Sequence, residues 1–294
     1  MGKLQPCTPG ELNLYLLAKK QDNPDLSADE ITRDYLTASF GSKGYPLVRA
    51  AYDSAFPFIM SVFYTLGNHT ADHSRLNFHR PTIYSTHTTG EWYPPDQQMR
   101  FVGHNVNRWF HNYKDIINVL SFPVYKTDTA AMQKDLKWVL DSGWLNSNEM
   151  MSWEYLRYII AEKDYGVQLA EGMLRNMIHA SELINHPHQT DDLIHVFRRS
   201  LIVAKERRGA AKAIYGYRLW CKGKAFQTIE LKKLILQGLD ETEQMLDSID
   251  QYPLNVPLGH WRWKRDRESF DIYKKAITQL GWKELKLFGI VGKE

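Results

Sequence analysis

Residues 67–98 carry the densest group of side chains that could do chemistry. Two histidines and two carboxylates in this stretch could act together as acids and bases: His73, His79, Asp72 and Glu91. A histidine beside a carboxylate can serve as a general acid or base, because its ordinary pKa lies near neutral pH. These four residues are the candidate catalytic residues. The alternative is that the histidines satisfy backbone groups of a long loop.

The same stretch and a second one contain side chains suited to binding a sugar. These candidates are aromatic or basic: Trp92, Tyr93, Arg75, Arg80, His87, Trp261 and Trp263. Aromatic rings offer a flat apolar surface, and cations attract acidic sugars or phosphates. The alternative is structural, with the rings anchoring the chain and the cations remaining in water. Carbohydrate therefore stays open as a ligand.

We expect no metal and no cofactor. His69, Asp72 and His73 are spaced three and four apart, but no second motif accompanies them, as strong zinc or di-iron patterns require. Three more residues of types that can bind a metal lie at the end of a predicted helix, just before a turn: His179, Glu182 and His186. They share one helical face, whereas metal sites in helical bundles draw their ligands from several helices.

Helices must position these side chains, because apolar residues recur every three or four positions along most of the chain. The predicted helices cover residues 11–22, 31–40, 45–66, 98–120, 128–140, 149–183, 192–220, 224–249 and 268–280. The sequence therefore predicts an all-α fold, a multi-helix bundle with long antiparallel helices and one long irregular loop at 67–98. We expect helices 149–183 and 192–220 to form an antiparallel hairpin.

Local signals set several helix ends near the N-terminus. The pair Asn23-Pro24 should stop the first helix, because a residue before proline avoids helical angles. Ser27 and Glu30 have the spacing of a capping box for the second helix, and Gly41 is placed to end that helix in a left-handed conformation. Pro57 should kink or divide helix 45–66.

Three residues of the expected hairpin carry a further prediction. Thr190 is available as the N-cap of the second long helix. Gly166 and Gly172 lie inside the first long helix, where a glycine costs about 1 kcal/mol relative to alanine. They indicate close contact with another helix, or a bend.

Composition limits the domain organisation and the classes of partner. With 294 residues and 43% hydrophobic content, the chain can bury one large core, so we expect a lead-in at 1–10 and a single helical domain at 11–294, with a subdomain divide near 118–128. A net charge of +3 argues against a nucleic-acid surface. No apolar run approaches the roughly 18 residues of a membrane span. Cys7 and Cys221 are expected to be free thiols.

One stretch resembles a known family. The residues N-L-Y-L-L-A-K-K at 13–20, N-P-D at 23–25, D-E at 29–30, R-D-Y at 33–35 and F-G at 40–41 resemble a junction in bacterial glycoside hydrolases of the α-glucuronidase-like kind. In those enzymes the last helix of a catalytic TIM barrel runs into a C-terminal helical domain. The resemblance brings no catalytic residue with it and implies a helical accessory domain, either a piece of a larger hydrolase or a free-standing relative.

Three functions follow as hypotheses. The first is a non-catalytic C-terminal helical domain of a carbohydrate-active hydrolase, which supports the catalytic barrel, dimerisation or the sugar cleft. The second is a self-contained helical enzyme with its site in loop 67–98, and the third is a protein-interaction scaffold. The expected partner is a catalytic barrel or a second copy of the chain. A larger hydrolase would be periplasmic or secreted, and otherwise the chain would be cytoplasmic.

Overall fold

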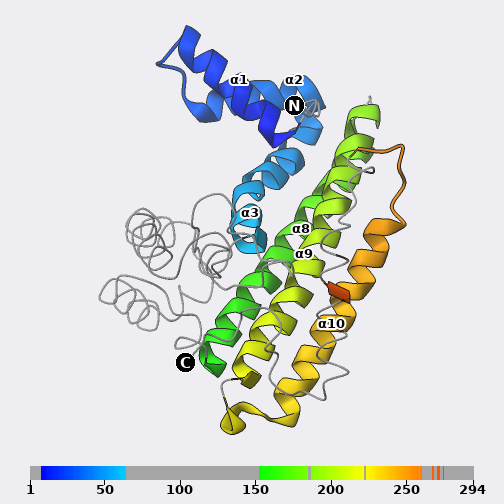
Figure 1. The fold of residues 1–294 in the computed structure, drawn as a ribbon. Coiled ribbons are helices and arrows are strands. Elements are labelled where there is room, and N and C mark those ends of the chain that lie inside the picture. Colours follow the sequence, from blue (N-terminus) through cyan, green and yellow to red (C-terminus); the bar gives the residue numbers. More distant parts are fainter. Residues whose placement is uncertain are drawn as a thin grey trace, which may run out of the picture. The chain divides into compact units, whose positions relative to one another are not determined.

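The computed structural model describes residues 8–63, 152–184, 187–221, 223–257 and 259, together with Arg267, Phe270, Asp271 and Lys274. Every regular element assigned within these residues is a helix (Figure 1). The prediction of an all-α bundle is therefore confirmed. The loop 67–98, the predicted helices 98–120 and 128–140 and the divide near 118–128 lie outside the described residues.

The chain divides into two compact units, each assembled from three segments. Unit 1 comprises Met1–Phe58, Gln168–Ile202 and Gln251–Arg262, and unit 2 comprises Ile59–Val167, Val203–Asp250 and Trp263–Glu294. The two longest helices contribute one half to each unit. Each unit has its own buried apolar side chains, among them Phe40, Val48 and Met177 in unit 1 and Leu156, Ile214 and Ile235 in unit 2.

Helix α1 (Pro9–Asp22) begins and ends where its local residues direct. The Thr8 hydroxyl accepts a hydrogen bond from the Glu11 amide at 3.4 Å, and Pro9 occupies the first turn, where its missing amide costs no hydrogen bond. The helix ends at Asn23, the residue before Pro24, as predicted. The chain then turns into α2, on which α1 packs.

Helix α2 (Ala28–Asp53) starts with the predicted capping box. The Ser27 hydroxyl accepts from the Glu30 amide at 3.1 Å, and the Glu30 carboxylate accepts from the Ser27 amide at 2.9 Å. Gly41 has the predicted positive φ, 73°, and its non-helical angles separate two helical runs within α2. The predicted end of a helix at Gly41 is therefore confirmed, and a second helical run follows it directly.

The predicted division of residues 45–66 occurs one turn earlier than expected. Helix α2 ends at Asp53, and α3 (Ala55–Phe63) follows after Ser54. Pro57 is the third residue of α3, where a backbone amide has no acceptor within the helix. The proline is therefore accommodated in the first turn of a new helix, and the break falls before it.

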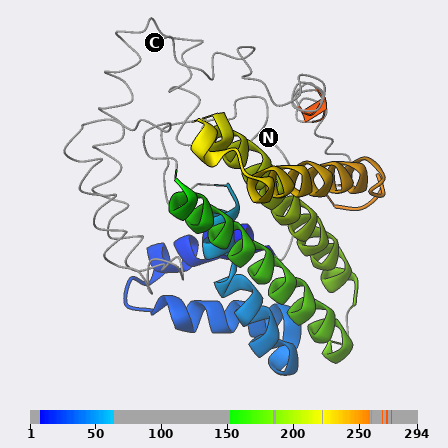
Figure 2. The ribbon, with the colours of Figure 1, turned by 90° about the horizontal axis from the view of Figure 1, so that it is seen from below.

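Helices α8 (Trp153–Leu183) and α9 (Pro187–Cys221) run in opposite directions side by side within each unit (Figures 1 and 2). This arrangement confirms the predicted antiparallel hairpin. Helix α9 begins at Pro187, five residues before the predicted start, because proline favours the first position of a helix. Thr190 is consequently buried inside α9, and its prediction as the N-cap was wrong.

The predicted helix 224–249 is divided into a short 3₁₀ turn, η3 (Lys224–Phe226), and helix α10 (Ile229–Asp250). The Thr228 hydroxyl accepts from the Leu231 amide at 3.2 Å, so a local cap starts α10 after the turn. Two cations near the C-terminus pair with α10: Arg267, directly before the expected last helix, with Asp247 and Asp250, and Lys274, within that expected helix, with Glu243.

Glycines allow helices of unit 2 to approach closely. A Cβ atom on Gly238 of α10 would lie 2.6 Å from the carbonyl oxygen of Gly209 on α9. A Cβ on Gly166 of α8 would lie 2.7 Å from Val62, which confirms the predicted close contact there. Among the described residues, a Cβ on Gly172 would meet only the end of the Arg175 side chain, at 4.0 Å, so no close contact with another described helix accounts for this glycine.

Candidate functional site

The catalytic and sugar-binding candidates from the sequence lie outside the described residues, so these assignments stay predictions. They are His73, His79, Asp72, Glu91, Trp92, Tyr93, Arg75, Arg80, His87, Trp261 and Trp263. His179 and Glu182 are exposed near the end of α8, and His186 lies outside the described part of the chain. The described residues contain no group of three or more side chains able to hold a metal ion. None of the helices described is long and apolar enough to cross a membrane.

Helix α1 has apolar side chains on two opposite sides. On the inner side Leu12 is buried, and the Tyr15 ring packs on Tyr35 of α2 with 5.0 Å between ring centroids. On the outer side Leu14 and Leu17 are 51% and 58% exposed. At 3.6 residues per turn these two leucines share a face opposite Leu12. Leu14 and Leu17 define the outer face of α1.

A hydrogen bond fixes α1 on α2 beside this aromatic pair. The Tyr35 hydroxyl donates to the Glu11 carboxylate at 2.8 Å. The contact joins residues 24 positions apart and is partly buried. Because α1 is held on its inner side by both a ring contact and a hydrogen bond, its outer face is presented on a supported helix.

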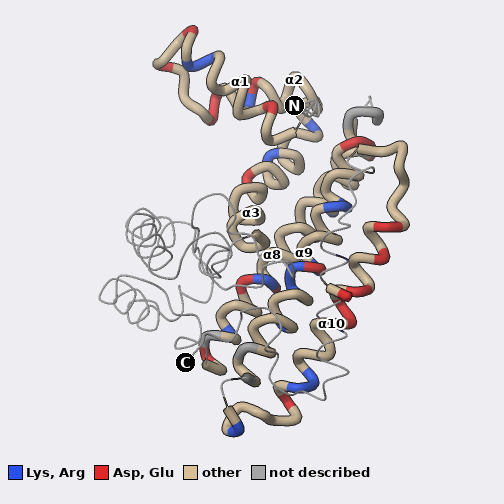
Figure 3. Tube along the Cα trace, in the orientation of Figure 1, with Lys and Arg blue, Asp and Glu red and all other residues tan. Residues whose placement is uncertain are grey.

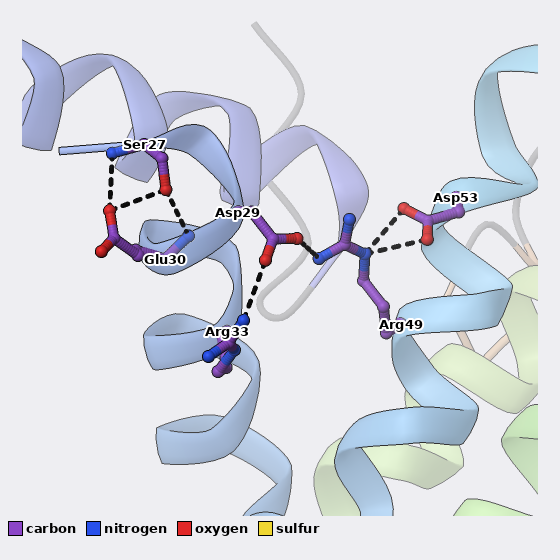
Figure 4. A network of polar contacts seen from close by, with 6 residues as sticks. All are labelled: Ser27, Asp29, Glu30, Arg33, Arg49 and Asp53. Carbon is purple, nitrogen blue, oxygen red and sulfur yellow. Dashed lines mark hydrogen bonds and ion pairs between the residues drawn. The ribbon is translucent and has the colours of Figure 1, made fainter.

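An ionic network lies along α2 (Figure 4). Asp29 accepts from Arg33 at 3.0 Å and from Arg49 at 2.7 Å, and Arg49 also pairs with Asp53 at 2.8 Å. Hydrogen bonds from Arg49, and then from Arg33, hold the pKa of Asp29 below its ordinary range. Asp29 is therefore ionised at neutral pH and can pair with both arginines.

Unit 2 buries four charged side chains on neighbouring turns of α8 and α9: Glu162, Lys163, Glu206 and Arg207. The Lys163 ammonium donates to the Ser61 carbonyl of α3 at 2.7 Å and lies 3.3 Å from Glu162. Arg207 lies 3.1 Å from Glu206. Burial lowers the pKa of Lys163, attraction to Glu162 opposes that change, and repulsion by Arg207 adds to it. These contacts hold α3 against α8.

The sequence contains an indication of this buried cluster that the prediction from helical periodicity did not use. Glu162 and Lys163 fall between Ile159 and Gly166, at the spacing of the buried face of α8. Charged residues at apolar positions are rarely buried unless they are paired. A charged pair within such a face could therefore have indicated a polar core contact, although not its partner on α3.

A second ionic group joins three helices of unit 2. Arg208 of α9 pairs with Asp164 of α8 at 3.1 Å and with Glu241 of α10. Lys212, one turn further along α9, pairs with the same Glu241 at 3.0 Å. Figure 3 shows that both basic and acidic positions occur along α8, α9 and α10. The side chains of this ionic group are partly buried. The group fixes the relative positions of the helices around the close approach of Gly209 to Gly238.

Unit 1 contains a histidine, tyrosine and arginine group that sequence patterns did not reveal. The Tyr252 hydroxyl donates to the His195 carbonyl at 3.2 Å and lies 3.1 Å from the His195 Nδ1 atom. The Arg199 guanidinium stacks over the Tyr252 ring at 5.1 Å. Burial raises the pKa of Tyr252. This group ties the segment after α10 to α9 and has the contacts of a structural anchor.

Comparison with protein-family models, with curated proteins and with solved structures finds no match to this chain.

Proposed function

We propose that this chain is a helical accessory domain of a carbohydrate-active glycoside hydrolase. We propose further that a docking face on α1, the outer face defined by Leu14 and Leu17, packs on the catalytic barrel of that enzyme. Two observations support the proposal. Residues 13–41 resemble the junction between barrel and helical domain in α-glucuronidase-like hydrolases. Leu14 and Leu17 are exposed on the side of α1 opposite to its contact with α2.

The exposed leucines support docking on a barrel because they lie on the side of α1 that does not contact α2. The last helix of a barrel must place an apolar side against the strands, while the helical domain that follows must hold the same helix from another side. Helix α1 has both sides: Leu12 and Tyr15 face inward, and Leu14 and Leu17 face outward. A helix that packed only within this chain would need only the inner apolar side.

The gain from docking can be worked out from these exposures. Full burial of a leucine side chain stabilises by about 1.5–3 kcal/mol, and about half of each side chain is already covered. Docking would therefore gain roughly 1 kcal/mol from each of Leu14 and Leu17. Together they correspond to about a 30-fold change in affinity.

The first experiment reads the coding sequence upstream of the Met1 codon. An open frame that continues into alternating strands and helices of a barrel is the expected result. An in-frame stop codon with a ribosome-binding site directly upstream of Met1 would overturn the proposal.

The second experiment expresses that upstream region separately and measures its binding to this chain by calorimetry. The double variant L14D/L17D should bind at least 30-fold more weakly than the wild type, since it loses both leucines and adds two charges. The matched control is I229D, which replaces an apolar side chain of α10 that is 77% exposed. Equal affinities for wild type and L14D/L17D would refute docking through α1.

A further inference from the structure

The two halves of α2 meet at a backbone joint that only glycine adopts readily. Gly41 has φ 73° and ψ 163°, in a region that a side chain disfavours. A Cβ atom at this position would meet no described residue within 4 Å, so within the described part of the chain the glycine serves the backbone conformation and not close packing. Because glycine also populates other conformations at low cost, the kink can change its angle.

Side chains from the two halves meet across this joint. Asp29 in the first half pairs with Arg49 in the second half at 2.7 Å (Figure 4). Interaction with Tyr45 across the same kink, and then with Asp29, raises the pKa of Arg33. On the buried side, the rings of Phe40 and Tyr52 meet edge to face with 6.4 Å between centroids.

We propose that the Asp29–Arg49 ion pair is a latch across the Gly41 kink, which sets the angle between the halves of α2 and hence the direction in which the docking face of α1 points. The inference deepens the proposed function, because Asp29 and Arg49 then become positioning residues for docking. The angle itself is a property of this chain and can be measured without a partner.

Two features make this contact a latch that can open. The side chains of Asp29 and Arg49 are 55% and 28% exposed, so salt in solution screens their attraction. Arg49 also has a second partner, Asp53, on its own half of the helix. When the kink opens, Arg49 still pairs with Asp53, so opening leaves no buried charge without a partner. The closed and open arrangements can therefore interconvert under mild changes of condition.

The experiment measures the distance across the kink in the full chain by pulsed electron spin resonance. Spin labels are attached to cysteines introduced at Asn13 and Ala50, both exposed, after Cys7 and Cys221 are replaced by serine. The wild-type background should give one narrow distance distribution. The D29N variant should give a broader distribution with a second maximum, because the contact across the kink is lost.

The matched control is D53N, which also removes one carboxylate partner of Arg49 but leaves the cross-kink contact intact. Its distribution should match that of the wild type. Raising the salt concentration to about 1 M, where the Debye length is about 3 Å, should shift the wild type toward the D29N distribution. This salt titration needs no variant and keeps the test valid if D29N folds poorly.

Identical distributions for wild type and D29N, or equal shifts for D29N and D53N, would overturn the latch. An unshifted wild type in about 1 M salt would also overturn it. These outcomes are independent of whether a barrel binds α1. Failure of the latch would leave the docking proposal standing, and failure of docking would leave the latch standing.

Discussion

Replacing Lys163 by methionine should destabilise unit 2 by about 3 kcal/mol, and the structure gives the reasons for that magnitude. Lys163 is fully buried and donates to the Ser61 carbonyl at 2.7 Å. A hydrogen bond from a charged donor contributes about 1.5–3 kcal/mol, and breaking a buried ion pair costs about 3–5 kcal/mol. Repulsion between Lys163 and Arg207 disappears in the variant, which favours the lower end of that range. Methionine fills a similar volume, so no large cavity adds to the cost.

The assay is urea unfolding followed by circular dichroism, with K233M on α10 as the control because Lys233 is exposed. K233M should change the free energy of unfolding by less than about 0.5 kcal/mol. The double variant E162L/K163M should recover much of the loss from K163M, because replacing a buried pair by apolar side chains is often neutral. A loss below about 1 kcal/mol for K163M, or no recovery in the double variant, would refute this account of the buried cluster.

Three other outcomes are expected. Burial lowers the pKa of Lys163 below its ordinary 10.5. Between the lowered pKa and pH 10.5, Lys163 therefore binds more protons in the unfolded chain than in the folded chain, so the free energy of unfolding of the wild type should rise with pH relative to that of K163M. A difference in urea midpoint that stays constant over this range would contradict the prediction. Gly238→Ala should lower the melting temperature, because its Cβ would lie 2.6 Å from the Gly209 carbonyl oxygen, whereas Gly172→Ala should stabilise by about 1 kcal/mol in calorimetry. Ser27→Ala should cost about 1 kcal/mol in urea unfolding through the lost N-cap, and Ser27→Asp should restore most of it.

The presence of the helices could be predicted because the sequence signals that start and stop a helix involve neighbouring residues. The capping pair Ser27 and Glu30 and the stop at Asn23-Pro24 act within four residues, and both appear in the structure as expected. The errors arose where two local signals competed. At the start of α9, Pro187 set the first turn and the capping residue Thr190 became buried, because proline loses nothing at that position.

The α1 site was only half predictable. The recurrence of apolar residues every three or four positions predicted a helix over residues 11–22, and the structure places Leu12 and Tyr15 of that helix toward α2. Two other leucines of this helix, Leu14 and Leu17, were indistinguishable from buried residues in the sequence. Whether an apolar side chain is covered depends on what packs over it, and a helical period carries no record of that.

The sequence by itself determined the all-α class, the capping box of Ser27 and Glu30 and the antiparallel pair of long helices, because backbone hydrogen bonds and caps involve residues within about four positions of each other. Only the tertiary structure decided that Lys163 reaches Ser61, 102 residues away, and that Gly166 lies against Val62 of α3, whereas Gly172 has no such close contact among the described residues. Both glycines have the same local cost in a helix. The difference between them comes from α3, which packs on the turn of α8 that holds Gly166, and no stretch of neighbouring residues contains that fact.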